Sequence, residues 1–531
     1  MRLDRALPAL SFVMAITGLL VVHPAISKEA RVPAADSPAV ATATTTLAAP
    51  VQDSMVTTQH ALTIDGRRLH YQAQAGSLVI HDAQGRPDAA MFHVAYTVEA
   101  AAGAAPRPLT FLFNGGPGSS TIWLHMGSVG PVRVHSADAQ ASGPPPYTWE
   151  ENPFSLLDRS DLVFVDAIGT GYSTGLPREG DGAEDPSRRF WGTDADIDAF
   201  ARFVQAYISR HQRWNAPRFL FGESYGTVRA VGVARRLQTL GIESNGIVLM
   251  SSILNFGARL PGFDHEYIHT LPTFAAIAWH HGLAGRDAPD QASFLQQVRR
   301  FAREDYALAL AQGNTLPPQR SDALVEQLAA YTGIAATVWR DSNLRVGIPR
   351  FRKELLRRDG VAVGRYDGRF LGLESEVAGD VPDDDASSSA ILGAFSSTLN
   401  DYLGRALDYR DLRPYRIKAP LTGVWDWKHA VPGAQGPMLP VPVPVMTEDL
   451  GAVLRANPRL KVLSANGLYD LSTPFSAAEY DLAHVPVNGA LRDNITLTYY
   501  PAGHMMYLEP GSLQALRQDL RRFYDAALAA Q

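Results

Sequence analysis

Three residues of the chain have the types and the placement needed for nucleophilic catalysis. Ser224 lies in the run GESYG, directly after the apolar stretch RFLF and before a segment with helical spacing. Asp470 ends the run KVLSANGLYD, and His504 ends the run YYPAGH. A serine hydroxyl attacks a carbonyl carbon only when a base removes its proton, and the base needs an acid to orient it. The order serine, acid, histidine therefore predicts a catalytic triad of Ser224, Asp470 and His504.

A second Gly-x-Ser-x-Gly run surrounds Ser173, so this pattern alone does not identify the nucleophile. A nucleophile elbow needs a strand before the serine and a helix after it, because the serine backbone is strained between them. The segment after Ser173, TGLPREGDG, breaks a helix, which favours Ser224 and leaves Ser173 as a turn or pocket-wall residue. Asp481 and Asp493 are the alternative acids and His484 is the alternative base. All three are less well placed, on a helix or in a turn.

Acyl transfer also needs backbone N–H groups directed at the negative charge that develops on the carbonyl oxygen. One such group belongs to the residue after the nucleophile, here Tyr225. The other usually comes from a glycine-rich loop after an earlier strand, and FLFNGGPGSS, with Gly115, Gly116 and Gly118, is placed for this role.

These residues need a sheet to position them, and the sequence predicts one. Residues 57–100 alternate polar and apolar side chains, as antiparallel strands do. Three later apolar runs each end in a glycine-rich loop, which is typical of a parallel sheet buried on both faces. Helical periodicity dominates residues 262–414, and strand patterns return before a final amphipathic helix. We therefore predict an α/β fold with a mostly parallel central sheet, formed by residues 56–261 and 415–531, and a helical insertion or cap at 262–414.

The N-terminus is typical of an exported protein. A weakly basic start and a mostly apolar stretch predict a signal peptide over residues 1–27, with an uncleaved membrane anchor as the alternative. Residues 28–55, rich in Ala, Thr and Pro, are predicted to be a disordered linker. We expect a bacterial protein in the periplasm or the medium, without stable membrane insertion after signal cleavage.

Composition excludes several other classes. The chain has 531 residues, of which 46% are hydrophobic, which is enough for a large core. It has no cysteine, which excludes disulfides, thiolate zinc sites and cysteine catalysis. The net charge of −6 and the absence of a basic tract give no indication of nucleic-acid binding. No metal or cofactor is predicted, and the oligomeric state stays open.

Taken together, the motifs resemble the serine carboxypeptidase family, peptidase family S10, within the α/β-hydrolase superfamily. The matching runs extend from residue 114 to residue 505 and are NGGPGSS, VFVDAIGTGYS, GESYG, PAGHM and, more loosely, NGLYDLSTP. The resemblance implies an enzyme that releases single amino acids from peptides with a free C-terminus, with Ser224, Asp470 and His504 as its triad.

The resemblance also implies roles around the triad. Gly116 and Tyr225 would supply the oxyanion N–H groups, and Asn114 and Glu223 would bind the terminal carboxylate of the substrate. Met505 would lie near the side chain of the leaving residue. A glutamate donates a hydrogen bond to a carboxylate only when it is protonated, so we expect burial to raise the pKa of Glu223, or the pair to share a proton. The alternatives are a buried structural carboxylate for Glu223 and a turn-capping role for Asn114.

The chain departs from the family pattern at two informative positions. Ser128 stands where members usually have a glutamate, which leaves the pH optimum open. Arg229 is an additional charge near the elbow, and it either reinforces carboxylate binding or pairs with a structural acid.

Two other functions remain possible at this point. An acyltransferase or esterase could use the same scaffold, because an acyl-enzyme can pass to other nucleophiles. A non-catalytic binding protein on a hydrolase fold is the third interpretation, and the intact serine, aspartate and histidine set argues against it. The preferred C-terminal residue and the physiological substrate are not predicted.

Overall fold

The computed structural model describes residues 54–529, except for residues 100–102, 104, 137, 183, 422 and 432–440. The predicted signal peptide, and all but the last two residues of the predicted linker, lie outside the described residues. The elements described below belong to one compact unit, Ala48–Gln531. Among the described residues, no helix has the length and apolar character needed to cross a membrane.

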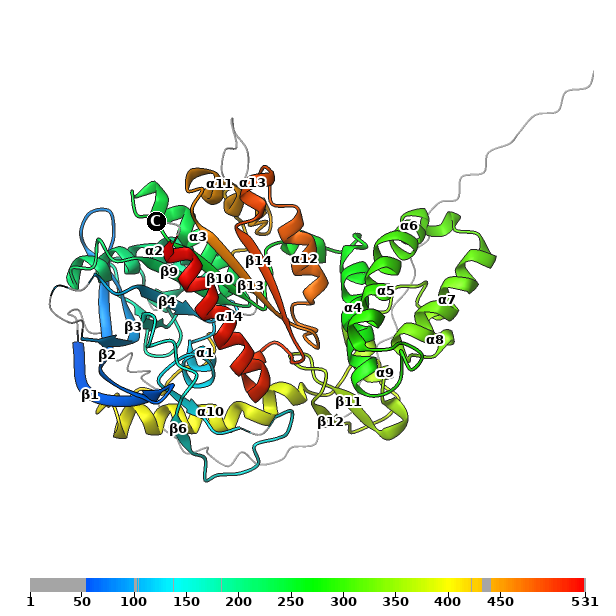
Figure 1. The fold of residues 1–531 in the computed structure, drawn as a ribbon, viewed down its shortest axis with the longest axis horizontal. Helices are drawn as coiled ribbons and strands as arrows, with labels where there is room; N and C mark the ends of the chain where they lie inside the picture. Colours follow the sequence, from blue (N-terminus) through cyan, green and yellow to red (C-terminus); the bar gives the residue numbers. More distant parts are fainter. Residues whose placement is uncertain are drawn as a thin grey trace, which may run out of the picture. The chain divides into compact units, whose positions relative to one another are not determined.

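A ten-stranded sheet runs through the centre of this unit (Figure 1). Its order is β1-β2-β3-β7-β4-β9-β10-β13-β14, and the short strand β8 pairs with β3. The pairs β1–β2, β2–β3 and β3–β7 are antiparallel, and every pair from β7 to β14 is parallel. The strands of this sheet are β1 (Ser54–Ile64), β2 (Arg67–His81), β3 (Pro87–Val98), β4 (Leu109–Phe113), β7 (Asp161–Val165), β8 (Thr174–Gly175), β9 (Arg218–Glu223), β10 (Gly246–Met250), β13 (Lys461–Gly467) and β14 (Ile495–Tyr500).

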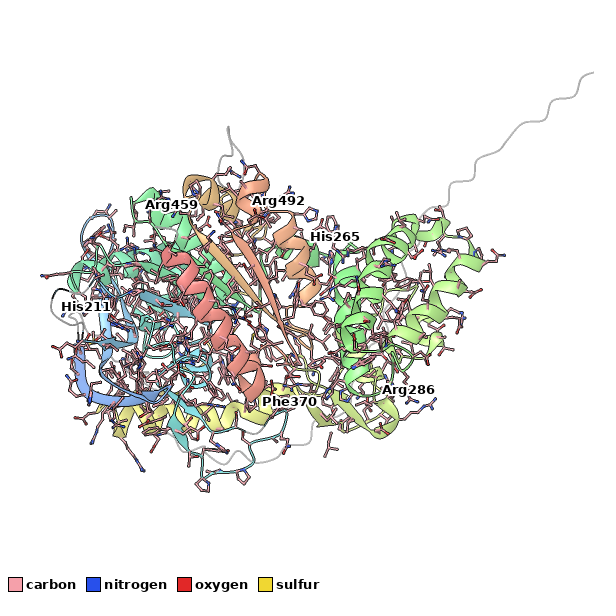
Figure 2. All side chains as sticks on the ribbon, in the orientation of Figure 1. His211, His265, Arg286, Phe370, Arg459 and Arg492 are labelled. Atoms are coloured by element: carbon pink, nitrogen blue, oxygen red, sulfur yellow. The ribbon has the colours of Figure 1, made fainter. Side chains whose placement is uncertain are left out.

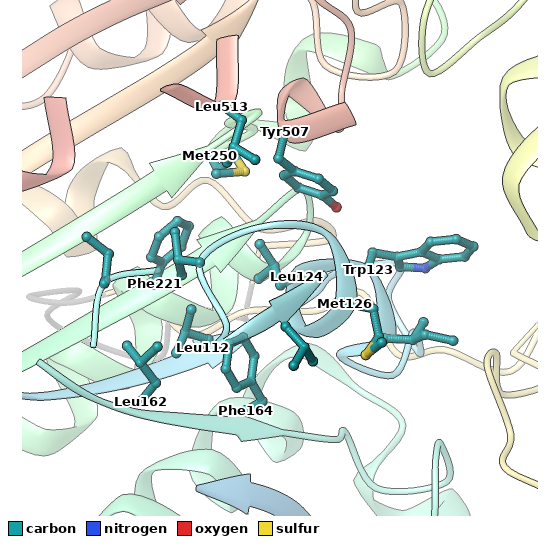
Figure 3. Close-up of a cluster of buried hydrophobic side chains, with 14 of the residues drawn as sticks. Leu112, Trp123, Leu124, Met126, Leu162, Phe164, Phe221, Met250, Tyr507 and Leu513 are labelled. Atoms are coloured by element: carbon teal, nitrogen blue, oxygen red, sulfur yellow. The ribbon is translucent and has the colours of Figure 1, made fainter. Parts of the chain in front are cut away.

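Helices cover both faces of the parallel strands. Alternate strand residues point to opposite faces, so each strand contributes apolar side chains to two clusters. Leu112, Phe221 and Met250 belong to one core cluster, which they share with residues from α1, α10 and α14 (Figure 3). Their neighbours in sequence, such as Leu220 and Leu249, belong to a second cluster with α2, α3 and α11. The bounds of these helices are α1 (Ile122–Gly127), α2 (Thr193–Arg210), α3 (Gly226–Thr239), α10 (Ala386–Arg405), α11 (Thr447–Ala456) and α14 (Pro510–Ala529).

Most of the chain between β10 and β13 is helical, and its helices build two different cores. Helices α4 to α9 share a third cluster of buried residues, beside the sheet in Figure 1. Helix α10 belongs instead to the first cluster, where its Phe395 packs on Trp123 of α1. The elements of this region not yet given are α4 (His265–His280), α5 (Gln291–Phe301), a π-helical turn (Ala302–Tyr306), α6 (Ala307–Gln312), α7 (Pro318–Thr332), α8 (Ala336–Asp341), α9 (Ile348–Glu354) and the hairpin of β11 (Val361–Val363) and β12 (Leu371–Leu373).

Smaller elements complete the unit. Strands β5 (Val132–Val134) and β6 (Trp149–Glu151) form a two-stranded sheet, and α12 (Phe475–Ala483) and α13 (Gly489–Arg492) lie between β13 and β14 in the chain. The predicted fold class, a mostly parallel central sheet with a helical insertion, is confirmed.

A buried histidine links α2 and α11. His429 Nδ1 lies 2.6 Å from Asp194 Oδ1, and its Nε2 lies 2.9 Å from Asp449 Oδ2. Burial alone would lower the pKa of His429, but the hydrogen bonds and charges of the two carboxylates raise it to about 9. We call these three residues the His429 cluster.

The predicted site residues leave the sheet at one edge. Asn114 follows β4, Ser224 follows β9, Asp470 follows β13 and His504 follows β14. These strands are parallel, so their carboxyl ends lie on the same side. This edge is where ligands bind in open α/β sheets.

Candidate active site

Ser224 occupies a strained turn between β9 and α3. Its φ angle is +61°, a left-handed conformation that non-glycine residues rarely adopt. The turn is very tight, because a Cβ atom on Gly222 would lie 1.9 Å from the carbonyl oxygen of Gly226. The Ser224 N–H donates to the Met250 carbonyl oxygen at 3.0 Å, which ties the turn to β10. The context therefore has the strand, the strained serine and the helix that a nucleophile elbow requires.

His504 and Asp470 are in direct contact. His504 Nδ1 lies 2.7 Å from Asp470 Oδ2, and both side chains are buried. Asp470 Oδ1 accepts from the backbone N–H groups of Ser472 and Thr473, at 2.8 and 3.0 Å. The Thr473 hydroxyl donates to Asp470 Oδ2 at 2.5 Å and lies 3.1 Å from His504 Nδ1. Thr473 was not predicted, although its position three residues after the acid is a common place for such a contact.

The backbone of His504 is held in place as well. The backbone N–H of His504 donates to the Tyr366 carbonyl oxygen at 2.6 Å, and the His504 carbonyl oxygen accepts from the Ser251 hydroxyl at 2.6 Å. Burial alone would lower the pKa of His504, but the charge and hydrogen bond of Asp470 raise it above its ordinary value. A raised pKa makes His504 a stronger base while it is neutral.

A pocket of about 140 Å³ opens beside these residues. Its lining includes five predicted residues together with Met505, and Asp470 lies behind His504 rather than in the wall. Tyr225 has its side chain buried among Phe256, Trp425 and Trp427. The lining residues are Asn114, Gly115, Gly116, Ser119, Trp123, Glu223, Ser224, Arg365, Tyr366, Ser388, Ile391, Lys418, Ser472, His504 and Met505.

Asn114 and Glu223 form a buried pair at this pocket. Asn114 Nδ2 donates to Glu223 Oε1 at 2.9 Å, and Asn114 Oδ1 accepts from the Leu124 N–H at 3.0 Å. The second contact orients the amide, so that its NH₂ group faces the carboxyl group. Burial raises the pKa of Glu223 to about 7, while the positive charge of His504 acts in the opposite direction. The expected rise in pKa is therefore present.

The second oxygen of Glu223 is closed to solvent and lies near the Tyr507 hydroxyl. Within the part of the chain that the structure describes, Glu223 Oε2 is buried and makes no hydrogen bond of normal geometry. The Tyr507 hydroxyl lies close enough to favour the ionised form of Glu223, although it too makes no such bond. Figure 3 shows Tyr507 among the apolar side chains of the first core cluster. Because Asn114 donates to Oε1, the proton of a neutral Glu223 belongs on Oε2, near the Tyr507 oxygen.

The glycine-rich loop after β4 packs directly on the elbow. A Cβ atom on Gly115 would lie 2.4 Å from the Tyr225 nitrogen and 2.8 Å from the Gly226 nitrogen, so only glycine fits there. Gly116 has a φ of +109° and lines the pocket. The loop thus brings Gly116 and the backbone of Tyr225 to the same corner of the pocket, which suits the oxyanion roles predicted for them.

Arg229 donates a hydrogen bond to the backbone of this loop. The side chain is buried and its Nε lies 2.8 Å from Asp196 Oδ2, so it pairs with a structural acid, one of the two alternatives left open by the sequence. Its Nη1 also donates to the carbonyl oxygen of Asn114. Arg229 therefore positions the backbone of a predicted carboxylate-binding residue and does not line the pocket itself.

A second buried acid holds the other end of the loop. Asp166 Oδ1 accepts from the N–H and the hydroxyl of Thr121, at 2.8 and 2.7 Å, and from the Tyr415 hydroxyl at 3.0 Å. Burial raises the pKa of Asp166 to about 6. The contacts of Asp166 are with residues far apart in the sequence, so sequence patterns carried no signal for them.

The alternative residues occupy other positions. The Ser173 hydroxyl donates to the Asp166 carbonyl oxygen and accepts from the Phe92 N–H, which is a structural role. Ser128, at the position of the missing glutamate, donates to the Leu124 carbonyl oxygen. Asp481 on α12 accepts from the Leu254 N–H, and His484 follows the end of that helix.

Comparison with known proteins agrees with the geometry. The model of the serine carboxypeptidase family matches residues 67–237. A curated relative, serine carboxypeptidase-like 36 from Arabidopsis thaliana, is 30% identical over 192 residues, which are 35% of this chain and 35% of the relative. The match thus spans about a third of the relative's length.

One solved structure extends the likeness over most of the chain. Kex1Δp, a prohormone-processing carboxypeptidase from Saccharomyces cerevisiae, aligns with a TM-score of 0.51 and 15% sequence identity. The alignment covers 86% of this chain and 91% of that one. At this identity the likeness concerns the fold.

Proposed function

We propose that this chain is a serine-type carboxypeptidase of the serine carboxypeptidase family, because residues 67–237 match the model of that family and the chain has the α/β-hydrolase fold. It would release single amino acids from peptides that have a free C-terminus. The observation that carries this proposal is the buried Asn114–Glu223 pair in the same pocket as Ser224 and His504.

The pair supplies what an exopeptidase needs for recognising a chain end. The terminal carboxylate lies one residue beyond the scissile bond, so its receptor must lie close to the nucleophile. Glu223 is the residue before Ser224, and Asn114 is two residues before Gly116. Asn114 has a second N–H on its amide, and neutral Glu223 has its proton on Oε2, so together they offer two donors to one carboxylate.

The chemistry proposed for the triad begins with Ser224. Its oxygen forms a bond to the carbonyl carbon of the scissile peptide as its proton passes to His504. The N–H groups of Gly116 and Tyr225 stabilise the oxyanion. His504 then gives this proton to the leaving amine, and the C–N bond breaks to leave an acyl-enzyme. A water molecule loses a proton to His504 and adds to the acyl carbon, and Ser224 recovers its proton as the shortened peptide departs. Asp470 and Thr473 keep the imidazole in one orientation throughout.

Hydrolysis of matched peptides tests the proposal. We expect blocked dipeptides with a free carboxylate to be cleaved, and their C-terminal amides to be cleaved far more slowly. Ser224→Ala should lower kcat by at least about 10⁴-fold, because a triad without its nucleophile retains little activity. Ser173→Ala is the matched control, since it changes the other Gly-x-Ser-x-Gly serine, and it should keep its activity when folded.

Two results would contradict this proposal in different ways. Equal rates on free and amidated peptides, or activity on esters alone, would favour the acyltransferase or esterase. Failure of Ser224 to react with a fluorophosphonate would favour a binding protein without catalysis. Export is proposed from the sequence alone, and determining the N-terminus of the mature protein would test the predicted cleavage near residue 27.

A further inference from the structure

Two cationic side chains line the same pocket as the proposed carboxylate-binding pair. Arg365 and Lys418 are both exposed and both belong to the pocket wall. Over the described residues, neither side chain has an ion pair with a carboxylate within 4.0 Å. Among the described lining residues, the one carboxyl group is Glu223, and burial raises its pKa to about 7. The pocket wall thus carries two cations, and the Asp470 carboxylate behind His504 is an opposing charge.

The backbone of Arg365 is tied to the loops that carry the histidine and the acid. The Arg365 carbonyl oxygen accepts from the N–H of Leu471, the residue after Asp470, at 3.1 Å. The next residue, Tyr366, accepts the N–H of His504. The charge of Arg365 is close enough to lower the pKa of His504. The backbone of Arg365 is thus fixed relative to the proposed catalytic base.

The backbone around Lys418 pairs with the end of the glycine-rich loop. Lys418 forms an antiparallel bridge with Ser119, the Ser120 N–H donates to the Ile417 carbonyl oxygen at 3.0 Å, and the Ala419 N–H donates to Gly118 at 2.9 Å. The segment that carries Lys418 therefore pairs with the end of the glycine-rich loop through an isolated bridge. Lys418 consequently stands beside the proposed oxyanion corner.

We propose that the pocket selects substrates with an aspartate or glutamate at one of the two positions that flank the scissile bond. This inference rests on the proposed function, because it takes the terminal carboxylate to be held by Asn114 and Glu223. With that carboxylate in place, we take the side chains that flank the scissile bond to occupy the rest of a pocket of about 140 Å³, which both cations line. Opposite charges attract and like charges repel at short range, so the same cations disfavour lysine and arginine at these positions.

Two nearby acids limit the size of the effect, Asp470 behind His504 and Asp385 beside Arg365. Asp385 Oδ1 accepts from the backbone N–H of Arg365 at 2.8 Å, and its carboxylate lies 3.6 Å from the Arg352 guanidinium. The negative charge of Asp385 therefore offsets the charge of Arg352 as well as that of Arg365, so it cancels only part of the attraction of Arg365 for a substrate carboxylate. Because both cations are exposed, each contact with a substrate carboxylate should be worth about threefold in binding.

The test compares glutamate with its neutral isostere glutamine. Four blocked dipeptides place Glu or Gln at either side of the scissile bond, with alanine at the other position. We expect kcat/KM to favour Glu by about threefold to tenfold in at least one pair, and the preference to shrink as NaCl rises from 0.05 to 1 M. Arg365→Gln and Lys418→Gln should each lower the ratio of kcat/KM for the Glu peptide to kcat/KM for the Gln peptide, a ratio in which any effect on His504 cancels because both peptides share the same base.

Arg459→Gln is the matched control. Arg459 is exposed and lies just before β13, whereas Asp470 follows the other end of that strand. Figure 2 labels Arg459 far from Phe370, which lies in the same loop as Arg365. Arg459→Gln should keep the Glu preference.

The outcomes separate this inference from the proposed function. Equal kcat/KM for Glu and Gln peptides would overturn the inference and leave the carboxypeptidase proposal intact. An equal loss on all free-acid peptides in Arg365→Gln would also overturn it, by assigning that cation to the terminal carboxylate. If no peptide is cleaved, calorimetric binding of the same peptides to Ser224→Ala still decides it, and tighter binding of Glu peptides would support it.

Discussion

Replacing Glu223 by glutamine isolates the proton that the proposed recognition of the substrate carboxylate needs. Glutamine keeps the shape of the side chain and can accept from Asn114 as Glu223 does. Its NH₂ group donates at every pH, whereas Glu223 donates only when it is protonated. The substitution should therefore remove one pH dependence and leave the triad in place.

The pKa of Glu223 sets the expected size of the effect. With a pKa of about 7, the protonated fraction falls from about 90% at pH 6 to about 10% at pH 8. The pH dependence of kcat/KM reports groups in the free enzyme. For a peptide with a free carboxylate, recognition by Glu223 should thus weaken about tenfold over these two pH units. For an aryl ester that lacks a carboxylate, it should not change.

The assay is the ratio of kcat/KM for the peptide to kcat/KM for the ester, measured from pH 5 to 9. Titration of His504 affects both substrates and cancels in this ratio. In the native enzyme the ratio should fall about tenfold between pH 6 and pH 8, and in Glu223→Gln it should stay flat. Asp481→Asn is the control, because burial also raises the pKa of Asp481 to about 7 but Asp481 does not line the pocket. A flat ratio in the native enzyme, or the same fall in Glu223→Gln, would refute the reasoning.

Three further substitutions test the supports of the site and the fold. Arg229→Met leaves the Asp196 carboxylate buried without a cation, so it should lower the free energy of unfolding in urea by about 3–5 kcal/mol. Its control is Arg236→Met on the exposed side of the same helix, which should lower that free energy by less than about 1 kcal/mol. Thr473→Val removes a hydrogen bond from the triad acid and should lower kcat by about tenfold with little change in KM, and an unchanged kcat would show that the backbone contacts suffice. The pKa of His429 is raised in the folded state, so its stabilising contribution should be complete below pH 6.5 and lost as the pH rises through 9. His429→Gln should therefore flatten the fall in unfolding free energy between pH 6.5 and pH 9.

Local patterns were sufficient for the fold class and for the order of the predicted triad. The run before Ser224 is apolar, the glycines around it leave no room for side chains, and a helix starts directly afterwards, so the strand–turn–helix context is visible within about a dozen residues. Asp470 and His504 follow strands in the same manner. The family resemblance added roles for Asn114 and Glu223 that periodicity alone does not indicate.

The remaining parts of the site depend on contacts between distant segments. Arg365 reaches the pocket because its carbonyl oxygen binds the loop after β13, and Lys418 because its segment pairs with the glycine-rich loop. Neither residue lies in a motif, and each resembles an ordinary surface cation in the sequence. Arg229 was open between two roles, and only the packing of α2 against α3 shows its partner. Helix α10 was expected to belong with the other inserted helices, but it belongs to the first core cluster and packs on α1.

The crowding of Gly115 against the backbone of Tyr225 divides the site into two parts with different tolerance for change. No side chain larger than hydrogen fits between the loop and the elbow, so these segments can only shift together. The walls contributed by Arg365, Ser388 and Lys418 carry no such restriction. Laboratory evolution for new peptide preferences should therefore accumulate its successful substitutions in those walls, while libraries that randomise the glycines should return mostly insoluble protein.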